Sequence, residues 1–221
     1  MISLVNSHDE VTVGLPVLTT IAALGDSTTA GTPGFQSPIE APPDGSGNVE
    51  SQYGYWLMRA RPQWRVLNRG VNGERSDQIR HRFVRDVVLA RADLAIIVAG
   101  VNDIYQGRTA DAVQRELLAM YCAARDAGIP AVAGSILPYN TATPEQNARM
   151  QAVNAWIRDE GSPQTGAIFC DTRAAVAMPG RPDVLASTPD DIHPSPDGYR
   201  LMAVALIPAI ERALQLAGRL L

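Results

Sequence analysis

Short apolar runs alternate with longer segments of helical periodicity along this chain, and that alternation restricts the fold more than any other feature. Residues 94–99 read Leu-Ala-Ile-Ile-Val-Ala. Because every position is apolar, this run is typical of a parallel strand covered on both faces. The five predicted strands are residues 17–24, 65–68, 94–99, 129–137 and 167–170.

Helical patterns separate these strands. In residues 76–91 the apolar side chains Ile79, Phe83 and Val87 recur at steps of four, with arginine and aspartate on the opposite face. The other predicted helices are residues 110–127, 143–157 and 196–220. Strands and helices in this order predict an α/β fold in which helices cover both faces of a parallel sheet through right-handed crossovers.

The chain is predicted to form one domain over residues 1–221. Hydrophobic residues make up 46% of it, enough for a sizeable core, and no linker separates two complete folding units. Residues 1–16 are expected to be an N-terminal tail or extension. Residues 32–51 are rich in Pro, Gly, Ser and Asp. A loop of this length in a compact domain is usually functional or mobile, so we expect it to border a functional site.

The composition excludes several kinds of chemistry. All 19 basic residues are arginine, so lysine-based phosphate loops, Schiff bases and lysine general bases are absent. A net charge of −4 argues against a nucleic-acid partner. Cys122 and Cys170 have no partner at metal-ligand or redox spacing and are interpreted as small core residues.

No apolar stretch approaches the roughly 20 residues that span a bilayer. The N-terminal residues lack a basic segment followed by an apolar one, so they do not form a signal peptide. The chain is therefore expected to be cytoplasmic, or secreted if a signal peptide has been removed from it.

Reactive or polar groups follow each predicted strand, at the edge where open parallel sheets bind ligands. Hydroxyl, amide, carboxylate, imidazole and glycine backbone groups gather there. The segments are residues 25–29, 69–74, 100–103 and 138–140, together with 190–194 later in the chain.

Ser27 and His193 form a candidate nucleophile and base. A serine hydroxyl needs a base within hydrogen-bond reach, and the start of a helix would favour negative charge developing at Ser27. The alternative is that Ser27 only caps that helix. Among the three histidines, only His193 lies in a loop flanked by acids and prolines. Either Asp190 or Asp191 could hold one of its ring nitrogens.

Gly73 and Asn102 are candidate oxyanion-hole donors. Acyl transfer needs donors directed at the oxygen on which negative charge develops, and both residues follow strands near the centre of the predicted sheet. The alternatives are a tight turn at Gly73 and an Asx-type loop at Asn102. A single site would explain these two residues together with Ser27 and His193.

These segments resemble the SGNH/GDSL hydrolase superfamily. The resemblance consists of Gly25-Asp26-Ser27, Gly73, Gly100-Val101-Asn102-Asp103 and Asp190-x-x-His193-Pro194, which occur in family order over residues 25–194. Each motif alone is weak, whereas four in order are specific. Thr28 stands where the name-giving motif has leucine, as in some carbohydrate acetylesterases, and this leaves the substrate class open.

The resemblance implies both a fold and a set of roles. The fold would be a flavodoxin-like three-layer α/β/α sandwich with a five-stranded parallel sheet. Ser27 would be the nucleophile, His193 the base and Asp190 its orienting acid in preference to Asp191. The oxyanion donors would be Ser27, Gly73 and Asn102. Neither a metal nor an organic cofactor is implied, and Asp26 and Asp103 would fix loops.

The implied function is hydrolysis of carboxylic esters with short acyl or acetyl groups, and the partner is a small-molecule ester. Alternatives within the superfamily are a carbohydrate O-acetylesterase or a lysophospholipase or thioesterase. A more distant alternative is a non-catalytic, phosphate-binding flavodoxin-like module. Candidate wall residues of the pocket, which could equally be ordinary loop packing, are Ile104, Tyr105, Tyr139 and Asn140. The oligomeric state cannot be predicted from the sequence.

Overall fold

A five-stranded parallel sheet occupies the middle of the computed structural model, which describes residues 18–219. Residue 17 of the first predicted strand and the predicted tail, residues 1–16, lie outside the described residues. The strand order is β4-β1-β5-β6-β7. The strands are β1 (Thr19–Gly25), β4 (Trp64–Gly70), β5 (Leu94–Val98), β6 (Ala131–Gly134) and β7 (Ile168–Cys170).

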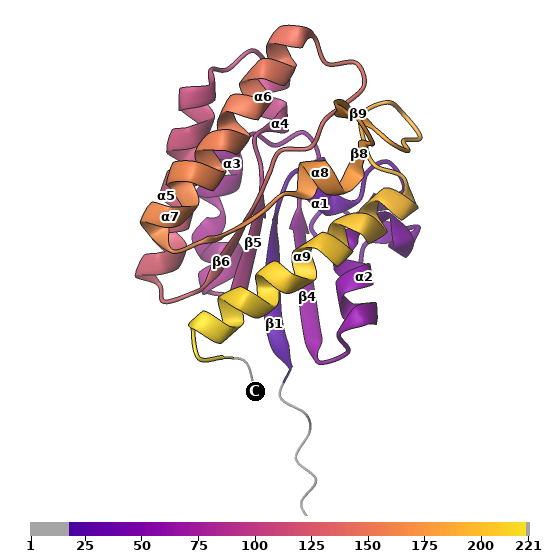
Figure 1. Cartoon of the computed structure of the whole chain (residues 1–221). Coiled ribbons are helices and arrows are strands. Elements are labelled where there is room, and N and C mark those ends of the chain that lie inside the picture. Colours follow the sequence, from indigo (N-terminus) through magenta and orange to yellow (C-terminus); the bar gives the residue numbers. More distant parts are fainter. Residues whose placement is uncertain (1–17, 220–221) are drawn as a thin grey trace, which may run out of the picture.

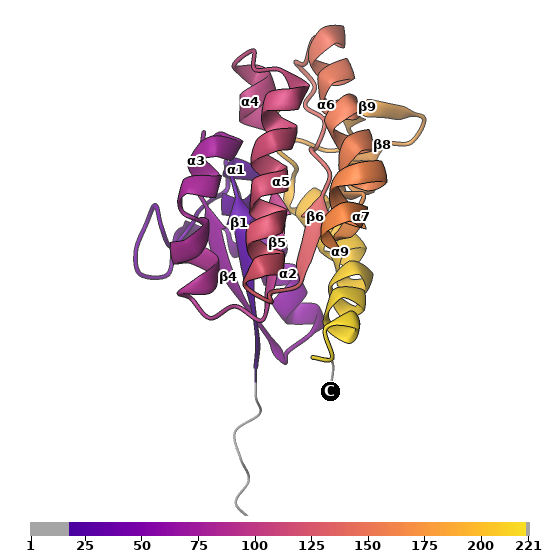
Figure 2. The same cartoon turned by 90° about the vertical axis from the view of Figure 1, so that its left-hand side faces the viewer.

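Helices cover both faces of this sheet, so the predicted three-layer α/β/α sandwich is confirmed (Figures 1 and 2). On one face lie α2 (Tyr53–Ala60), α8 (Thr172–Val176) and α9 (Pro196–Leu216). On the other face lie α3 (Ser76–His81), the π-helical turn η2 (Val84–Val88), α4 (Val101–Tyr105), α5 (Ala110–Asp126) and α6 (Pro144–Trp156). The short helix α1 (Ser27–Ala30) follows β1, whereas the π-helical η3 (Ile157–Gly161) and α7 (Ser162–Thr165) follow α6.

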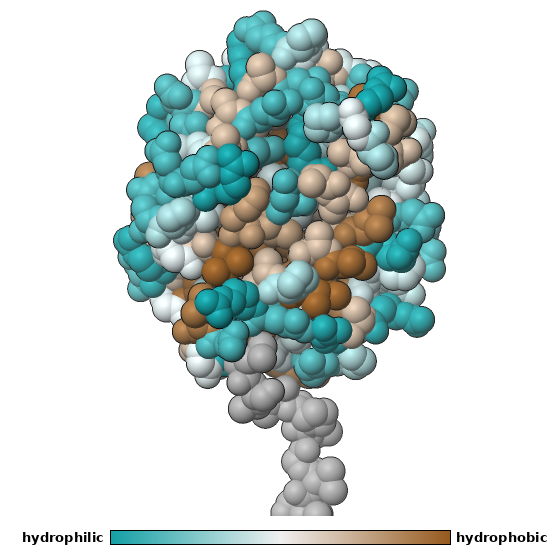
Figure 3. Space-filling view, viewed as in Figure 1, coloured by the Kyte–Doolittle hydropathy of each residue, from teal (hydrophilic) through white to brown (hydrophobic). Residues whose placement is uncertain are grey.

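Two apolar cores result from the alternation of side chains along each strand. In β1, Ile21 and Ala23 pack with α2 and α9, while Ala22 and Leu24 pack with α3 and α5. All five residues of β5 are buried, as expected for a central strand covered on both sides. The space-filling view shows that apolar residues also reach the surface over the face covered by α2, α8 and α9 (Figure 3).

Two predicted elements differ from the structure more than the others do. The strand predicted over residues 129–137 is limited to β6, because the side chain of Asn154 bonds both the N–H and the carbonyl of Ile136 and so takes over from the strand ladder. The helix predicted over residues 76–91 divides into α3 and η2. Its apolar residues Ile79, Phe83 and Val87 are nevertheless all buried.

The loop at residues 32–51 is folded on itself. It contains the hairpin strands β2 (Phe35–Gln36) and β3 (Ser46–Gly47) and the 3₁₀ turn η1 (Val49–Ser51). Ser37 Oγ donates to the carbonyl of Gly70 at 2.6 Å, and Glu40 Oε1 accepts from Asn72 N at 2.9 Å. The loop therefore packs against the end of β4. A second hairpin pairs β8 (Ala177–Met178) with β9 (Arg181–Leu185).

None of the helices within residues 18–219 is both long and apolar enough to cross a bilayer. In the same range, no three His, Cys, Asp or Glu side chains cluster as a metal-binding group would. Both cysteines are free thiols. Cys170 is buried, and its Sγ donates to the carbonyl of Ala205 at 3.3 Å.

Candidate active site

The parallel register brings three strand ends together. Gly25 at the end of β1 pairs with Gly70 of β4 and with Val98 of β5. The segments that carry Ser27, Gly73 and Asn102 therefore leave the sheet at one edge. A side chain at residue 25 would collide with Thr29 and with the Val98 carbonyl, so only glycine allows the chain to turn directly from β1 into α1.

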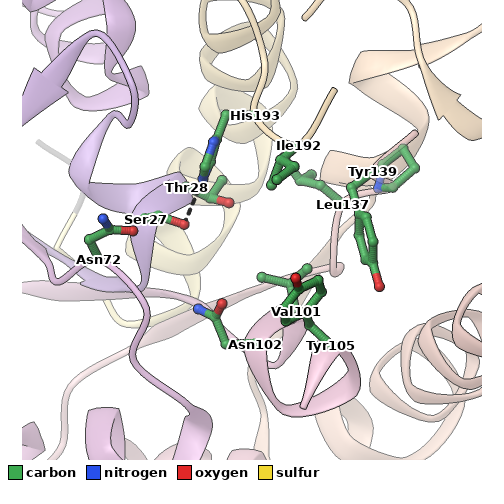
Figure 4. Close-up of a pocket in the computed structure, with 11 residues that line it drawn as sticks. Ser27, Thr28, Asn72, Val101, Asn102, Tyr105, Leu137, Tyr139, Ile192 and His193 are labelled. Atoms are coloured by element: carbon green, nitrogen blue, oxygen red, sulfur yellow. Dashed lines mark hydrogen bonds between the residues drawn. The ribbon is translucent and has the colours of Figure 1, made fainter. Parts of the chain in front are cut away.

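Ser27 is the first residue of α1. Asp26 caps this helix, since its Oδ1 accepts from Thr28 N at 3.0 Å. Ser27 is 5% exposed, but its hydroxyl reaches the opposite loop. His193 Nε2 lies 2.9 Å from Ser27 Oγ (Figure 4).

The other ring nitrogen of His193 faces Asp190, with Nδ1 and Oδ2 2.7 Å apart. Asp190 Oδ1 also accepts from the backbone N–H groups of Ile192 and His193, at 3.1 and 2.8 Å. Burial raises the pKa of Asp190, but the hydrogen bonds from His193 and Ile192 outweigh it and leave this pKa below its ordinary value. An ionised carboxylate only accepts, so Nδ1 carries the ring proton and Nε2 is free to accept the Ser27 proton.

The neighbouring carboxylate of Asp191 makes a different contact. The side chain of Asp191 accepts from Asn140 Nδ2 at 3.2 Å, and the backbone carbonyl of Asp191 accepts from Asn140 N at 2.7 Å. Of the two carboxylates that spacing alone left open, the structure therefore brings Asp190 to His193. Asn140 is a clamp on the loop that carries the histidine, and it is not among the residues lining the cavity.

A cavity of about 220 Å³ lies beside Ser27 and His193. In Figure 4, apolar and aromatic side chains stand across the cavity from the Ser27–His193 pair. The lining residues are Ser27, Thr28, Asn72, Val101, Asn102, Tyr105, Leu137, Pro138, Tyr139, Ile192 and His193.

Of the four predicted wall residues of the pocket, two line the cavity and two do not. Tyr105 and Tyr139 line the cavity and form an edge-to-face pair with ring centroids 6.1 Å apart. Tyr105 is 62% exposed at the rim, whereas Tyr139 is buried, and burial raises the pKa of its hydroxyl. Ile104 belongs to the core beneath the sheet and Asn140 clamps a loop, so neither is a wall residue.

Asn102 lines the cavity and Gly73 does not. Asn102 Nδ2 donates to the Glu74 carbonyl at 3.0 Å, which leaves its second N–H free. Gly73 has a φ of 76°, a left-handed conformation that favours glycine, and its neighbour Asn72 reaches the lining instead.

Sequence reasoning also missed the lining residues Thr28, Asn72, Val101, Leu137, Pro138 and Ile192. Most of them lie in the strand-end segments that the sequence marks. The four apolar residues among them carried a weak signal, because apolar side chains in such segments look like ordinary packing.

Two buried aspartates fix the surrounding loops. Asp103 accepts from Ser76 N at 2.7 Å, from Ser76 Oγ at 2.8 Å and from Arg108 at 2.7 Å. Asp26 is fully buried. Burial raises its pKa to about 7 against hydrogen bonds from Thr28 that lower it, and the charge of Asp103 adds to the rise while that of Arg82 opposes it.

The family model and the relatives that match this chain all point to one family of hydrolases. A sequence model of the GDSL-like lipase/acylhydrolase family matches residues 23–201. An acetylxylan esterase of Geobacillus stearothermophilus is 27% identical over 161 residues, which are 66% of this chain and 72% of that protein.

The fold also matches solved structures. A lipolytic protein of the G-D-S-L family from Desulfitobacterium hafniense superposes with a TM-score of 0.71 at 23% identity, covering 86% of this chain and 99% of the other. A GDSL-like lipase from Bacteroides thetaiotaomicron superposes with a TM-score of 0.69 at 22% identity, covering 89% of each chain.

Proposed function

Because the chain belongs to the GDSL-like lipase/acylhydrolase family, we propose that it hydrolyses carboxylic esters through an acyl-enzyme formed on Ser27. Membership of this family makes the protein an ester-cleaving hydrolase and argues against the phosphate-binding module. One observation carries the assignment of the residues. His193 lies between Ser27 and Asp190, with 2.9 Å from Nε2 to Oγ and 2.7 Å from Nδ1 to Oδ2.

In the first half-reaction Ser27 Oγ attacks the ester carbonyl carbon while His193 Nε2 takes the hydroxyl proton. The tetrahedral intermediate then collapses as the bond to the alcohol oxygen breaks, and His193 returns the proton to that oxygen. In the second half-reaction His193 deprotonates a water molecule, which attacks the acyl carbonyl carbon. The bond from that carbon to Ser27 Oγ then breaks, the acid leaves, and His193 returns the proton to Ser27 Oγ. Asp190 keeps the imidazole in the correct tautomer and stabilises its protonated form.

We assign three hydrogen-bond donors to the negatively charged oxygen of the tetrahedral intermediate. They are the backbone N–H groups of Ser27 and Gly73 and the side-chain amide of Asn102. Such donors act on charge that develops in the transition state. The free N–H of Asn102 beside the cavity supports its part in this set.

We assign the apolar side of the cavity, with Val101, Leu137 and Ile192, to a short acyl chain on a small-molecule ester. A carbohydrate O-acetylesterase is the second candidate, and the 27% identity to an acetylxylan esterase supports it.

Covalent labelling with a fluorophosphonate, followed by peptide mass spectrometry, tests the nucleophile. We expect modification at Ser27 in the native protein, none in Ser27→Ala, and loss of ester hydrolysis in the same variant. Hydrolysis that persists in Ser27→Ala would overturn the proposal.

A chain-length series of p-nitrophenyl esters, run beside acetylated xylo-oligosaccharides, tests the substrate. Higher kcat/KM for butanoate or hexanoate than for acetate supports a short-chain acyl esterase. Release of acetate from the sugar at higher kcat/KM than from any aryl ester supports the carbohydrate enzyme.

We propose that the chain, residues 1–221, forms a single hydrolase domain, and the one five-stranded sheet within the described residues supports this. The expectation of a cytoplasmic or exported enzyme stays a prediction, which fractionation of the cells that produce it would test.

A further inference from the structure

Behind the active site, one arginine joins the ends of two neighbouring strands. Arg82 follows α3 and is only 6% exposed. Its Nη2 donates to the Gly25 carbonyl at the end of β1, and its Nη1 donates to the Arg69 carbonyl near the end of β4, both at 2.7 Å. These two carbonyls lie just before the segments that carry Ser27 and Gly73.

The same guanidinium holds the loop that contains Gly73. Arg82 Nε donates to Glu74 Oε2 at 2.7 Å, and the Glu74 carbonyl accepts from Asn102 Nδ2 at 3.0 Å. Glu74 is thus held by its side chain from Arg82 and bonded through its backbone to Asn102. Hydrogen bonds therefore connect Arg82 through Glu74 to Asn102, and Gly73 directly precedes Glu74 in the chain.

This arrangement is stiff for a physical reason. A guanidinium is planar and presents its N–H groups in fixed directions, and Asp86 accepts from Nη1 at 2.7 Å as well. Since the guanidinium is buried, water has little access to its N–H groups, and charge-assisted bonds of this length are about twice as strong as neutral ones. A lysine would keep the charge but could not reach four acceptors in one plane.

We propose that Arg82 is a positioning residue for ester hydrolysis, which sets Gly73 and Asn102 relative to Ser27. The inference rests on the proposed function. Arg82 does not line the cavity, so it acts through Glu74 and the strand ends and not on the substrate itself.

A positioning role of this kind has a kinetic signature. Oxyanion donors act on the transition state, so displacing them lowers kcat and kcat/KM together and leaves KM nearly unchanged. A merely structural role would lower the stability of the fold without lowering kcat selectively at an unchanged KM.

The test compares Arg82→Gln and Arg82→Lys with Arg85→Gln. Arg85 also bonds Asp86, through Nε at 2.7 Å and Nη2 at 3.0 Å, but its side chain is 63% exposed and does not contact the strand ends. We expect kcat for a p-nitrophenyl ester to fall about 10- to 100-fold in the Arg82 variants, less than a directly lost donor would cost. Arg85→Gln is expected to stay within about twofold of the native enzyme.

A double-mutant cycle with Asn102→Ala isolates the pathway. If Arg82 acts through the oxyanion donors, the cost of Arg82→Gln shrinks in the Asn102→Ala background. An equal cost in both backgrounds, a loss confined to KM, or native kcat in a folded Arg82 variant would each overturn the inference.

Glu74→Gln decides the matter if the Arg82 variants do not fold. It weakens only one arm of the guanidinium and leaves the two carbonyl contacts in place. A lower kcat at unchanged KM, again diminished in the Asn102→Ala background, supports the inference, and native kcat overturns it. Failure of the proposed function is separate, because it would appear as hydrolysis that persists in Ser27→Ala.

Discussion

Two adjacent carboxylates in the His193 loop have different partners. Asp190 bonds the ring and backbone of His193, whereas Asp191 has a φ of 64° and faces Asn140. Sequence spacing favoured neither residue, because three and two positions from a histidine are equally reachable in a turn.

Replacing each carboxylate by its amide tests this difference. Asp190→Asn is expected to lower kcat by up to about 10⁴, since an amide can hold the imidazole in the wrong tautomer. Asp191→Asn is the matched control and is expected to stay within about threefold, because asparagine tolerates the left-handed region well. Steady-state kinetics on one p-nitrophenyl ester measure both, and equal losses would contradict the assignment.

Asp26 is predicted to make stability depend on pH. Its pKa is raised to about 7 in the folded protein by burial, so the folded state holds this proton more tightly than the unfolded chain. The stabilising contribution is complete below about pH 4 and is lost as pH rises towards 7. Asp26→Asn should therefore match the native protein near pH 4 and exceed its free energy of unfolding at pH 8, by up to about 4 kcal/mol at about 1.4 kcal/mol per pKa unit.

Urea unfolding at pH 4, 6 and 8 measures this difference. A difference between Asp26→Asn and the native protein that does not change with pH would contradict the raised pKa.

Among the helices, α6 shows most clearly how local sequence determines an element boundary. Thr143 Oγ1 accepts from Gln146 N at 3.2 Å, and Gln146 Oε1 accepts from Thr143 N at 2.9 Å. This reciprocal pair and Pro144 at the first turn define the start of the helix. Its C-terminal end was less predictable, because α6 continues through the π-helical η3 into α7.

Thr143→Ala is predicted to lower the free energy of unfolding by about 1 kcal/mol, since it leaves a helix N-terminal N–H without its cap. The residue does not line the cavity, so kcat/KM at 25 °C should not change. Chemical denaturation and steady-state kinetics on the same preparation check both parts. A fall in kcat/KM without loss of stability would contradict this view of α6.

For the whole molecule, the site depends on segments far apart in the chain meeting at one sheet edge. Ser27 and His193 are separated by 166 residues, yet a hydrogen bond joins them. The cavity beside them is lined by residues that follow β1, β4, β5 and β6, together with the loop before α9. Its apolar side exists only through this convergence.

Ile192→Ala tests the acyl side of the cavity. Ile192 is 44% exposed at the rim, and removing its apolar surface should cost a hexanoyl ester about 1 kcal/mol of transition-state stabilisation, roughly fivefold in kcat/KM. Hydrolysis of the acetyl ester should change by less than about twofold. Leu201→Ala, at an exposed residue of α9 outside the lining, is the control, and an equal effect on both esters would contradict the acyl assignment.

The sequence by itself determined the order of strands and helices, the buried central strand and the residues that could react. The periodicity of hydrophobic residues and the capping of helices are local properties of a sequence. The four motifs are also local, because they lie next to predicted strand ends. The α/β sandwich and the pairing of Ser27 with His193 were therefore within reach of sequence reasoning.

Only the tertiary structure showed which contacts Asp190 and Asp191 make, removed Ile104 and Asn140 from the pocket wall, and divided the helix predicted over residues 76–91. It also revealed the bonds of Arg82 to Gly25, Arg69 and Glu74. The physical reason is that these outcomes depend on the directions of side chains and on contacts between distant segments. Local periodicity carries no information about either.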